Sequence, residues 1–135
     1  MEFDSKAYIG EYIERARKAQ AEFEKMSQEE VDLAVKTIAK VVYDNAEYLA
    51  EIAVEETGMG NVPDKIAKNK QKSKIIWNNL KGKKSRGILD TDETTGITRI
   101  AKPVGVVAAI TPCTNPIVTP CLLYTSDAAD DSLRV

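Results

Sequence analysis

The chain has 135 residues, of which 43% are apolar, 30% charged and 6% aromatic, which is typical of one globular domain and not of two. Because histidine is absent, the chain alone cannot build a Ser-His-Asp or Cys-His catalytic pair, a His-ligated zinc site or an imidazole general base, and we predict no metal site. The net charge is only −2, but the charges are unevenly distributed.

Four amphipathic helices are predicted before Gly82. The first runs from about Asp4 to Lys25. A capping box formed by Ser27 and Glu30 starts the second. The apolar face of the first helix is expected on Ile9, Tyr12, Ile13, Ala16 and Phe23, and that of the second on Val31, Val35, Ile38, Val41 and Val42.

The third helix can be capped by Asp44 or Asn45, and Gly58 with Gly60 supplies the left-handed residues that end it. Pro63 stands where the fourth helix begins. The residues expected to face inward are Leu49, Ile52 and Ala53 in the third helix, and Ile66, Ile76, Trp77 and Leu80 in the fourth.

A basic stripe begins in the fourth helix and contains no acidic residue. Its nine members are Lys65, Lys68, Lys70, Lys72, Lys74, Lys81, Lys83, Lys84 and Arg86. The stripe can be a solvated face or an oligomer contact, a site for a phosphorylated small molecule, or a nucleic-acid surface. We favour the first interpretation, because Trp77 is the only aromatic residue nearby and single-strand binders interleave several.

A β-hairpin is predicted next, from the β-prone runs 87–89 and 97–100 around the turn-rich segment 90–96. The continuously apolar run from Val104 to Ile110 predicts a parallel strand that is covered on both faces. Asn115 and Pro116 then form a good N-cap and first residue of a further helix. The loop 111–115 would lie at the carboxyl end of that strand, where α/β folds bind ligands, although it contains no Gly-x-Gly-x-x-Gly motif.

Two cysteines, Cys113 and Cys121, are too few for a disulfide-stapled secreted domain. The run 104–110 is far shorter than a membrane span, and the acidic N-terminus does not resemble a signal peptide. We therefore expect a soluble cytoplasmic protein without a membrane partner.

Four segments together resemble the NAD(P)-dependent aldehyde dehydrogenases, and within them the coenzyme A-acylating branch. They are AEFEKMSQEEVD, EETGMGNVPDKIAKN, IIWNNLKGKKSRGI with DTDETTGITRIAKPVGVVAAITP, and TPCTNPIVTP. The resemblance implies an α/β fold in which residues 1–120 supply the N-terminal helices, the hairpin and the first strand of a truncated, doubly wound, Rossmann-like cofactor domain. It also implies that the hairpin serves oligomer contacts, so that the full-length parent is a homo-oligomer.

The resemblance further implies the reaction of an aldehyde, coenzyme A and NAD+ to acyl-CoA and NADH, with NADP as the other possible cofactor and the aldehyde undetermined. The matching positions would bind the cofactor through Ile110, Thr111, Pro112, Cys113 and Thr114. Asn115 would donate its amide to the oxyanion. Because this asparagine stands one place later than in the Pro-Trp-Asn-Phe-Pro loop of non-acylating members, the Thr114 hydroxyl, the loop backbone or helix capping alone are alternatives.

The family's catalytic cysteine lies far beyond the last residue of this chain, so we expect neither Cys113 nor Cys121 to be the nucleophile and the chain alone to be inactive. Residues 121–135 show no family pattern and are expected to be artefactual or disordered. A short terminal helix capped at Ser126 is the alternative.

Two other functions are compatible with the sequence. One is a small helical module that binds nucleic acid or a protein partner through the basic stripe, against which the isoelectric point near 5.3 weighs. The other is an adaptor that docks through its first helix.

Overall fold

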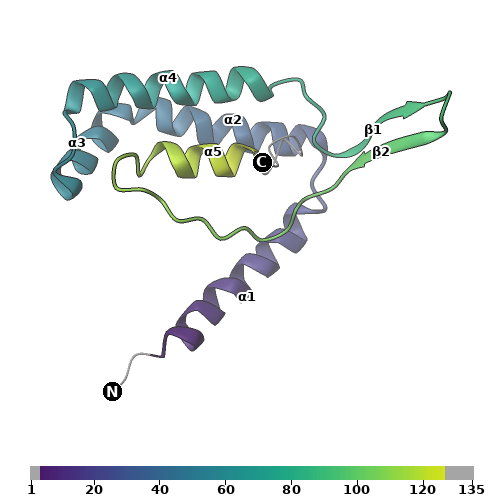
Figure 1. The fold of residues 1–135 in the computed structure, drawn as a ribbon, viewed down its shortest axis with the longest axis horizontal. Coiled ribbons are helices and arrows are strands. Elements are labelled where there is room, and N and C mark those ends of the chain that lie inside the picture. Colours follow the sequence, from purple (N-terminus) through teal and green to yellow (C-terminus); the bar gives the residue numbers. More distant parts are fainter. Residues whose placement is uncertain (1–3, 127–135) are drawn as a thin grey trace.

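The computed structural model describes residues 4–126 as helices and one antiparallel hairpin. The elements are α1 (Ser5–Phe23), α2 (Gln28–Asp44), α3 (Ala46–Thr57), α4 (Val62–Leu80), β1 (Gly87–Asp92), β2 (Ile97–Ala101) and α5 (Val118–Ser126). Helices α2, α4 and α5 lie side by side and α3 packs against α4, whereas α1 and the hairpin project away in different directions (Figure 1). Within residues 4–126, no helix is both long and apolar enough to span a membrane.

Helix α1 begins as predicted but does not bury its apolar face. The Asp4 carboxylate caps it by accepting the backbone N–H groups of Lys6 and Ala7, each at 3.0 Å. The expected burial is wrong, because no α1 residue is buried and Ile9 and Tyr12 are each 51% exposed. The helix leaves the bundle and packs against no other element of residues 4–126, so that only Phe23, at its end, reaches the core.

The core of the described residues centres on Val31 and Val35 of α2. Three partly buried side chains pack against them, Phe23, Trp77 and Leu80. The predicted capping box is confirmed, since Glu30 N–H donates to Ser27 Oγ at 3.2 Å and Ser27 N–H donates to Glu30 Oε2 at 2.7 Å. Farther along α2 the predicted apolar face is only partly buried, because Val41 is exposed and Ala39 is buried instead.

Helix α3 packs through small side chains, with Ala46, Ala50 and Ala53 buried. Of the predicted inward residues, Ala53 is confirmed, whereas Ile52 is exposed. Gly58 ends the helix at φ 64°, the left-handed conformation that the sequence predicts there.

Helix α4 begins next to Pro63, as predicted, but its buried residues are polar. Lys65, Asn69 and Ser73 are spaced by four residues and therefore lie on one face of the helix. We call these three residues the α4 polar row. The four apolar residues expected inside are only partly buried.

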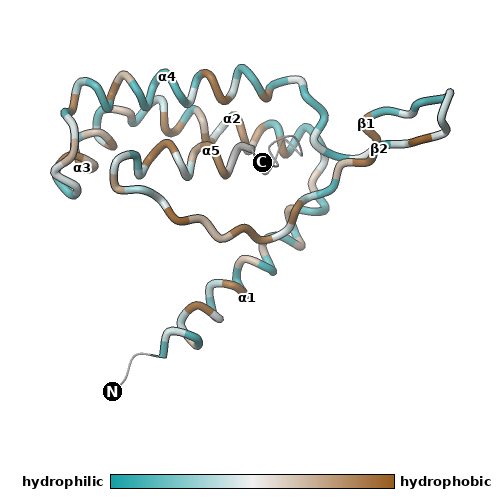
Figure 2. Tube along the Cα trace, viewed as in Figure 1, coloured by the Kyte–Doolittle hydropathy of each residue, from teal (hydrophilic) through white to brown (hydrophobic). Residues whose placement is uncertain are grey.

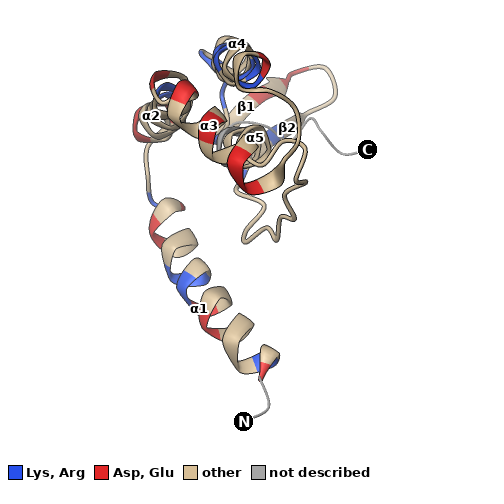
Figure 3. Ribbon diagram, turned by 90° about the vertical axis from the view of Figure 1, so that its left-hand side faces the viewer, with Lys and Arg blue, Asp and Glu red and all other residues tan. Residues whose placement is uncertain are grey.

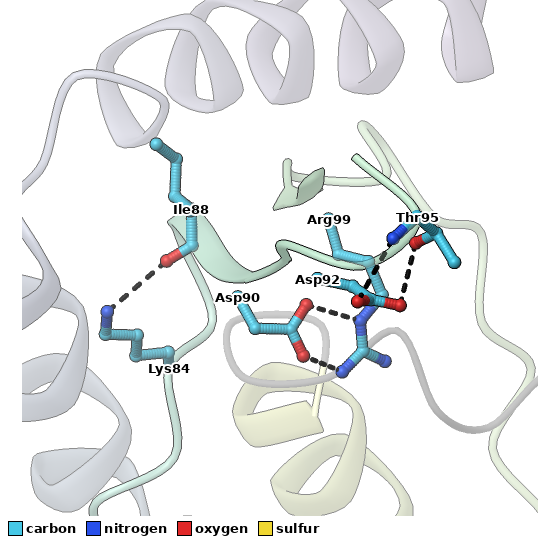
Figure 4. A network of polar contacts seen from close by, with 6 residues as sticks. All are labelled: Lys84, Ile88, Asp90, Asp92, Thr95 and Arg99. Atoms are coloured by element: carbon cyan, nitrogen blue, oxygen red, sulfur yellow. Dashed lines mark hydrogen bonds and ion pairs between the residues drawn. The ribbon is translucent and has the colours of Figure 1, made fainter. Parts of the chain in front are cut away.

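The hairpin is confirmed and is longer than predicted, because Asp92 organises its turn. The Asp92 carboxylate accepts the Thr95 hydroxyl at 2.7 Å (Figure 4). It also accepts the Thr94 N–H at 2.9 Å. Asp90 stands opposite Arg99, and its two carboxylate oxygens accept from the Nε–H and from Nη2 on one edge of the guanidinium group. These contacts lower the pKa of both aspartates, for Asp90 chiefly through Arg99 and for Asp92 chiefly through the Thr95 hydroxyl.

The parallel strand predicted for residues 104–110 is wrong. The segment belongs to no strand, and it takes part in no hydrogen bond between residues of the described range 4–126. The only sheet of that range is the pair β1 and β2, so that no neighbouring strand offers 104–110 a ladder. The apolar segment, brown in Figure 2, instead forms part of the exposed connection to α5.

The helix predicted to begin at Pro116 begins two residues later, so the predicted cap at Asn115 is also wrong. The first helical hydrogen bond runs from Cys121 N–H to the Ile117 carbonyl at 3.3 Å. The Asn115 carbonyl instead accepts the Thr119 hydroxyl at 3.4 Å. Of the expected tail, residues 121–126 lie in α5, whereas 127–135 and the alternative helix beyond Ser126 lie outside the described residues.

Arg86, the last residue of the basic stripe, holds the turn between α1 and α2. Its guanidinium donates to the backbone carbonyls of Phe23, at 3.0 Å, and of Glu24 and Met26. Next to it, the Ser85 N–H donates to Gln28 Oε1 at 2.9 Å. The segment before β1 is therefore fastened to the start of α2.

We predict that Arg86→Ala destabilises the fold by about 1 kcal/mol, because three carbonyls lose a charged donor in a partly solvated place. The free energy of unfolding from urea titration followed by circular dichroism measures this effect. Lys83→Ala, at an exposed position of the same stripe, is the control. Equal stability of the two variants would show that the guanidinium contacts contribute nothing.

A second prediction concerns the two thiols, which form no disulfide. Cys113 is exposed, whereas Cys121 is buried and burial raises the pKa of its thiol. Iodoacetamide at about pH 8 should therefore alkylate Cys113 more than about tenfold faster than Cys121, as read by peptide mass spectrometry. In urea the two rates should converge, and equal rates without urea would contradict the placement of Cys121.

A third prediction follows from the lowered pKa of Asp92. A carboxylate with a lowered folded pKa stabilises the hairpin above its unfolded pKa, and this contribution is lost as the pH falls through the folded pKa. The Thr95 amide resonance should therefore titrate below the ordinary aspartate pKa, and Asp92→Asn should abolish that titration. A midpoint at the ordinary value would contradict the turn geometry.

Candidate functional site

The loop singled out by the sequence meets the start of α4 at a pocket of about 270 Å³. The pocket is lined by Met59, Gly60, Asn61, Asp64, Lys65, Lys68, Thr114 and Asn115. It therefore joins the turn between α3 and α4 to a loop that lies about fifty residues later in the chain. We refer to this hollow as the loop pocket.

The α4 side of the loop pocket is built by a reciprocal cap. Asn61 Oδ1 accepts the Asp64 N–H at 2.9 Å, and Asn61 Nδ2 donates to the Asp64 carboxylate at 2.7 Å. Gly60 precedes the cap at φ 76°, where a side chain would be strained, and a Cβ there would lie 3.4 Å from Lys65 Cε. These hydrogen bonds therefore fix the part of the pocket wall that the turn between α3 and α4 forms.

Lys65 links the two sides of the loop pocket. It is only 9% exposed, and its ammonium donates to the Thr114 carbonyl at 3.2 Å. None of the ion pairs between residues 4–126 involves Lys65. In the sequence Lys65 is one member of the basic stripe, and composition does not predict this role. The signal for it is the four-residue spacing of Lys65, Asn69 and Ser73, which places three polar residues on one face of α4.

The six residues predicted as cofactor or oxyanion contacts are divided by the structure. Thr114 and Asn115 line the loop pocket, with Asn115 partly buried. The other four, Ile110, Thr111, Pro112 and Cys113, are exposed, and Ile110 is 97% exposed. The loop turns back on itself between them, where Asn115 N–H donates to the Pro112 carbonyl at 3.2 Å.

The chemistry that the loop pocket offers is hydrogen-bond donation. Asn115 supplies an amide and Lys68 an ammonium group, whereas the Lys65 ammonium already donates to the Thr114 carbonyl and Cys113 does not line the pocket. Over residues 4–126, no group of three or more Cys, Asp or Glu side chains is placed to hold a metal ion. The connection from 103 to the loop carries no charged residue, whereas α1 carries both acidic and basic residues and α4 carries mainly basic ones (Figure 3).

The basic stripe does not form one uniform surface. Lys65 is buried at the loop pocket, Arg86 is bound to three backbone carbonyls, and Lys84 donates to the Ile88 carbonyl at 3.3 Å. Lys70 lies 6.0 Å from the ring centre of Tyr43 on α2. Several members of the stripe thus serve contacts within the fold.

A second pocket, of about 340 Å³, lies between α2 and α4. Its lining residues include Tyr43, Trp77, Lys36, Lys40 and Lys74. It contains none of the residues that the sequence analysis singled out as cofactor or oxyanion contacts.

Comparison with known proteins assigns the family. The chain is 54% identical over 112 residues to a succinate-semialdehyde dehydrogenase (acetylating) of Clostridium kluyveri, which covers 83% of this chain and 25% of that protein. It is 47% identical over 114 residues to a sulfoacetaldehyde dehydrogenase (acylating) of Cupriavidus necator, covering 83% and 23%. The chain therefore spans about a quarter of the length of these curated relatives.

Among solved structures, an acetylating aldehyde dehydrogenase from Geobacillus thermoglucosidasius superposes with a TM-score of 0.81 at 40% identity, covering 88% of this chain and 27% of that one. The fold is thus that of the N-terminal part of such an enzyme. The family model for the aldehyde dehydrogenase family matches residues 2–125. This chain belongs to the aldehyde dehydrogenase family.

Proposed function

We propose that the chain is the N-terminal segment of an NAD(P)-dependent, coenzyme A-acylating aldehyde dehydrogenase. The observation that carries this proposal is the 54% identity to an acetylating relative over a segment that includes most of the chain. The reaction is the conversion of an aldehyde, coenzyme A and NAD+ into acyl-CoA and NADH. The catalytic cysteine would come from the part of the protein that this segment lacks.

In this proposal the loop pocket supplies the hydrogen-bond donor that stabilises the oxyanion. Asn115 lines the pocket from a loop whose backbone is fixed at Thr114 by Lys65. Its amide would donate a hydrogen bond to the oxygen of the aldehyde as the thiolate attacks, when negative charge develops there. The Thr114 hydroxyl and the loop backbone stand beside it as alternative donors.

The exposed segment before and within the loop has backbone groups that a cofactor could bind. Backbone groups of residues 104–111 take part in no hydrogen bond with described residues, so that their N–H and C=O groups are available to a ligand or a neighbouring strand. Residues 110–114 would then hold NAD or NADP, which accepts the hydride, while coenzyme A accepts the acyl group.

The remaining parts of the proposal concern assembly and location. The hairpin exposes Ile88, Ile97 and Ile100, and such apolar surface supports an oligomer contact in the full-length parent. We keep a cytoplasmic location in the proposal, because the two cysteines form no disulfide. The nucleic-acid alternative loses support, since Lys65 and Arg86 are used inside the fold.

The test is a chimaeric enzyme in which residues 1–120 replace the matching quarter of the Clostridium kluyveri relative. We predict NADH formation that requires coenzyme A, and a fall in kcat of about 100- to 1000-fold for Asn115→Ala, because one oxyanion donor is lost. The 135-residue chain alone should form no NADH.

Asn79→Ala is the matched control, because Asn79 is an exposed asparagine of α4 away from the loop pocket. Equal kcat values for Asn115→Ala and Asn79→Ala would remove the amide from the mechanism and favour the Thr114 hydroxyl, which Thr114→Val tests. A folded chimaera without activity would overturn the proposed function.

A further inference from the structure

Lys65 is a buried cation whose hydrogen-bond acceptor lies on a distant loop. The residue is 9% exposed, and its ammonium donates to the Thr114 carbonyl at 3.2 Å, across 49 positions of sequence. Lysine is almost never this deeply buried without a partner, since taking an ammonium group out of water is costly. A methionine would fill the same space without that cost, so packing alone does not explain a lysine here.

The acceptor belongs to a peptide group that is hydrogen-bonded at both ends. The Thr114 carbonyl and the Asn115 N–H are the two ends of one planar unit. The N–H end donates to the Pro112 carbonyl at 3.2 Å, and the carbonyl end accepts from Lys65. With both ends held, rotation of this plane is opposed. On the other side of the Asn115 Cα, the Asn115 carbonyl accepts the Thr119 hydroxyl at 3.4 Å, so the backbone that carries the Asn115 side chain is restrained on both sides.

No other long-range hydrogen bond performs this task in the part of the chain that the structure describes. Residues 104–111 are not hydrogen-bonded to the bundle, and Asn115 is otherwise bonded only locally, through Thr119. The backbone of Lys65 is itself fixed, because Lys65 lies in the first turn of α4, next to the cap formed by Asn61 and Asp64. The contact therefore transmits the position of α4 to the loop.

We propose that Lys65 is a positioning residue of the aldehyde dehydrogenase reaction, which fixes the Thr114–Asn115 peptide group through its ammonium and so aims the Asn115 amide into the loop pocket. This inference rests on the proposed function. Lys65 itself touches neither the aldehyde nor the cofactor in this role. Its removal should impair the chemical step more than substrate binding.

The first experiment uses the chimaeric enzyme. Lys65→Met keeps the stem and removes the ammonium, and we expect kcat to fall by about 10- to 100-fold while the aldehyde KM changes less than about threefold. Lys65→Arg, which keeps a cationic donor, should recover most of the lost kcat. Lys72→Met, at an exposed position of the same helix with the same change of charge, should behave like the parent.

The second experiment uses the 135-residue chain and does not depend on activity. A nitroxide label on the exposed Cys113, in a Cys121→Ala background, reports the mobility of the loop by electron paramagnetic resonance. Lys65→Met should make the label more mobile than Lys72→Met does, at an unchanged helical circular dichroism signal. Lys65→Arg should restore the parent spectrum.

The outcomes separate the two proposals. Equal label mobility in Lys65→Met and Lys72→Met overturns the tether. A more mobile label combined with an unchanged kcat overturns the positioning role and leaves the proposed function intact. A kcat of Lys65→Arg that is no higher than that of Lys65→Met also overturns the positioning role and leaves the proposed function intact. A folded chimaera with Lys65 intact and no activity overturns the proposed function and this inference together.

Discussion

The α4 polar row is the constraint on which the arrangement of this segment depends. Asn69 donates to the carbonyl of Ala46, the first residue of α3, at 3.3 Å, and Lys65 donates to Thr114 in the loop. Ser73 is satisfied within its own helix, by the Asn69 carbonyl at 2.7 Å. Apolar surfaces can slide over one another at small cost, but a buried donor that loses its acceptor costs about 1–3 kcal/mol. The row therefore fixes the register of α4 against α3 and against the loop.

Features that depend on neighbouring residues in the chain were predictable from the sequence. The capping box of Ser27 and Glu30, the left-handed Gly58 and the hairpin around Asp92 each need only a few residues in fixed order. Loop 111–115 was also predicted as a candidate site, because an apolar run that is followed within a few residues by Asn-Pro predicts a strand-to-helix junction. In the structure this loop meets α4 at a pocket, although the strand before it is not formed and the helix after it starts later.

Features that depend on distant partners were not predictable in the same way. An apolar run indicates that a segment is suited to burial, but not what buries it. The face of α1 and the run 104–110 both show this difference, since neither is covered by another element in residues 4–126. Lys65 shows the reverse case, in which composition indicates a solvated charge and tertiary packing buries it. Its acceptor is a backbone carbonyl, which carries no side-chain signal in the sequence.

The two sides of the loop pocket differ in whether this segment contains their partners. The side formed by α4, its cap and Lys65 is held by three hydrogen bonds between residues of this segment. The side formed by 104–113 has exposed apolar side chains and unused backbone groups, as a strand has before its neighbours are added. The Clostridium kluyveri relative is about four times as long as the matched segment, and in the full-length parent that we propose such neighbours would cover the run and leave the loop at the sheet edge. The Lys65 contact would then hold Asn115 in place from the helical side, independently of the strands that complete the other side.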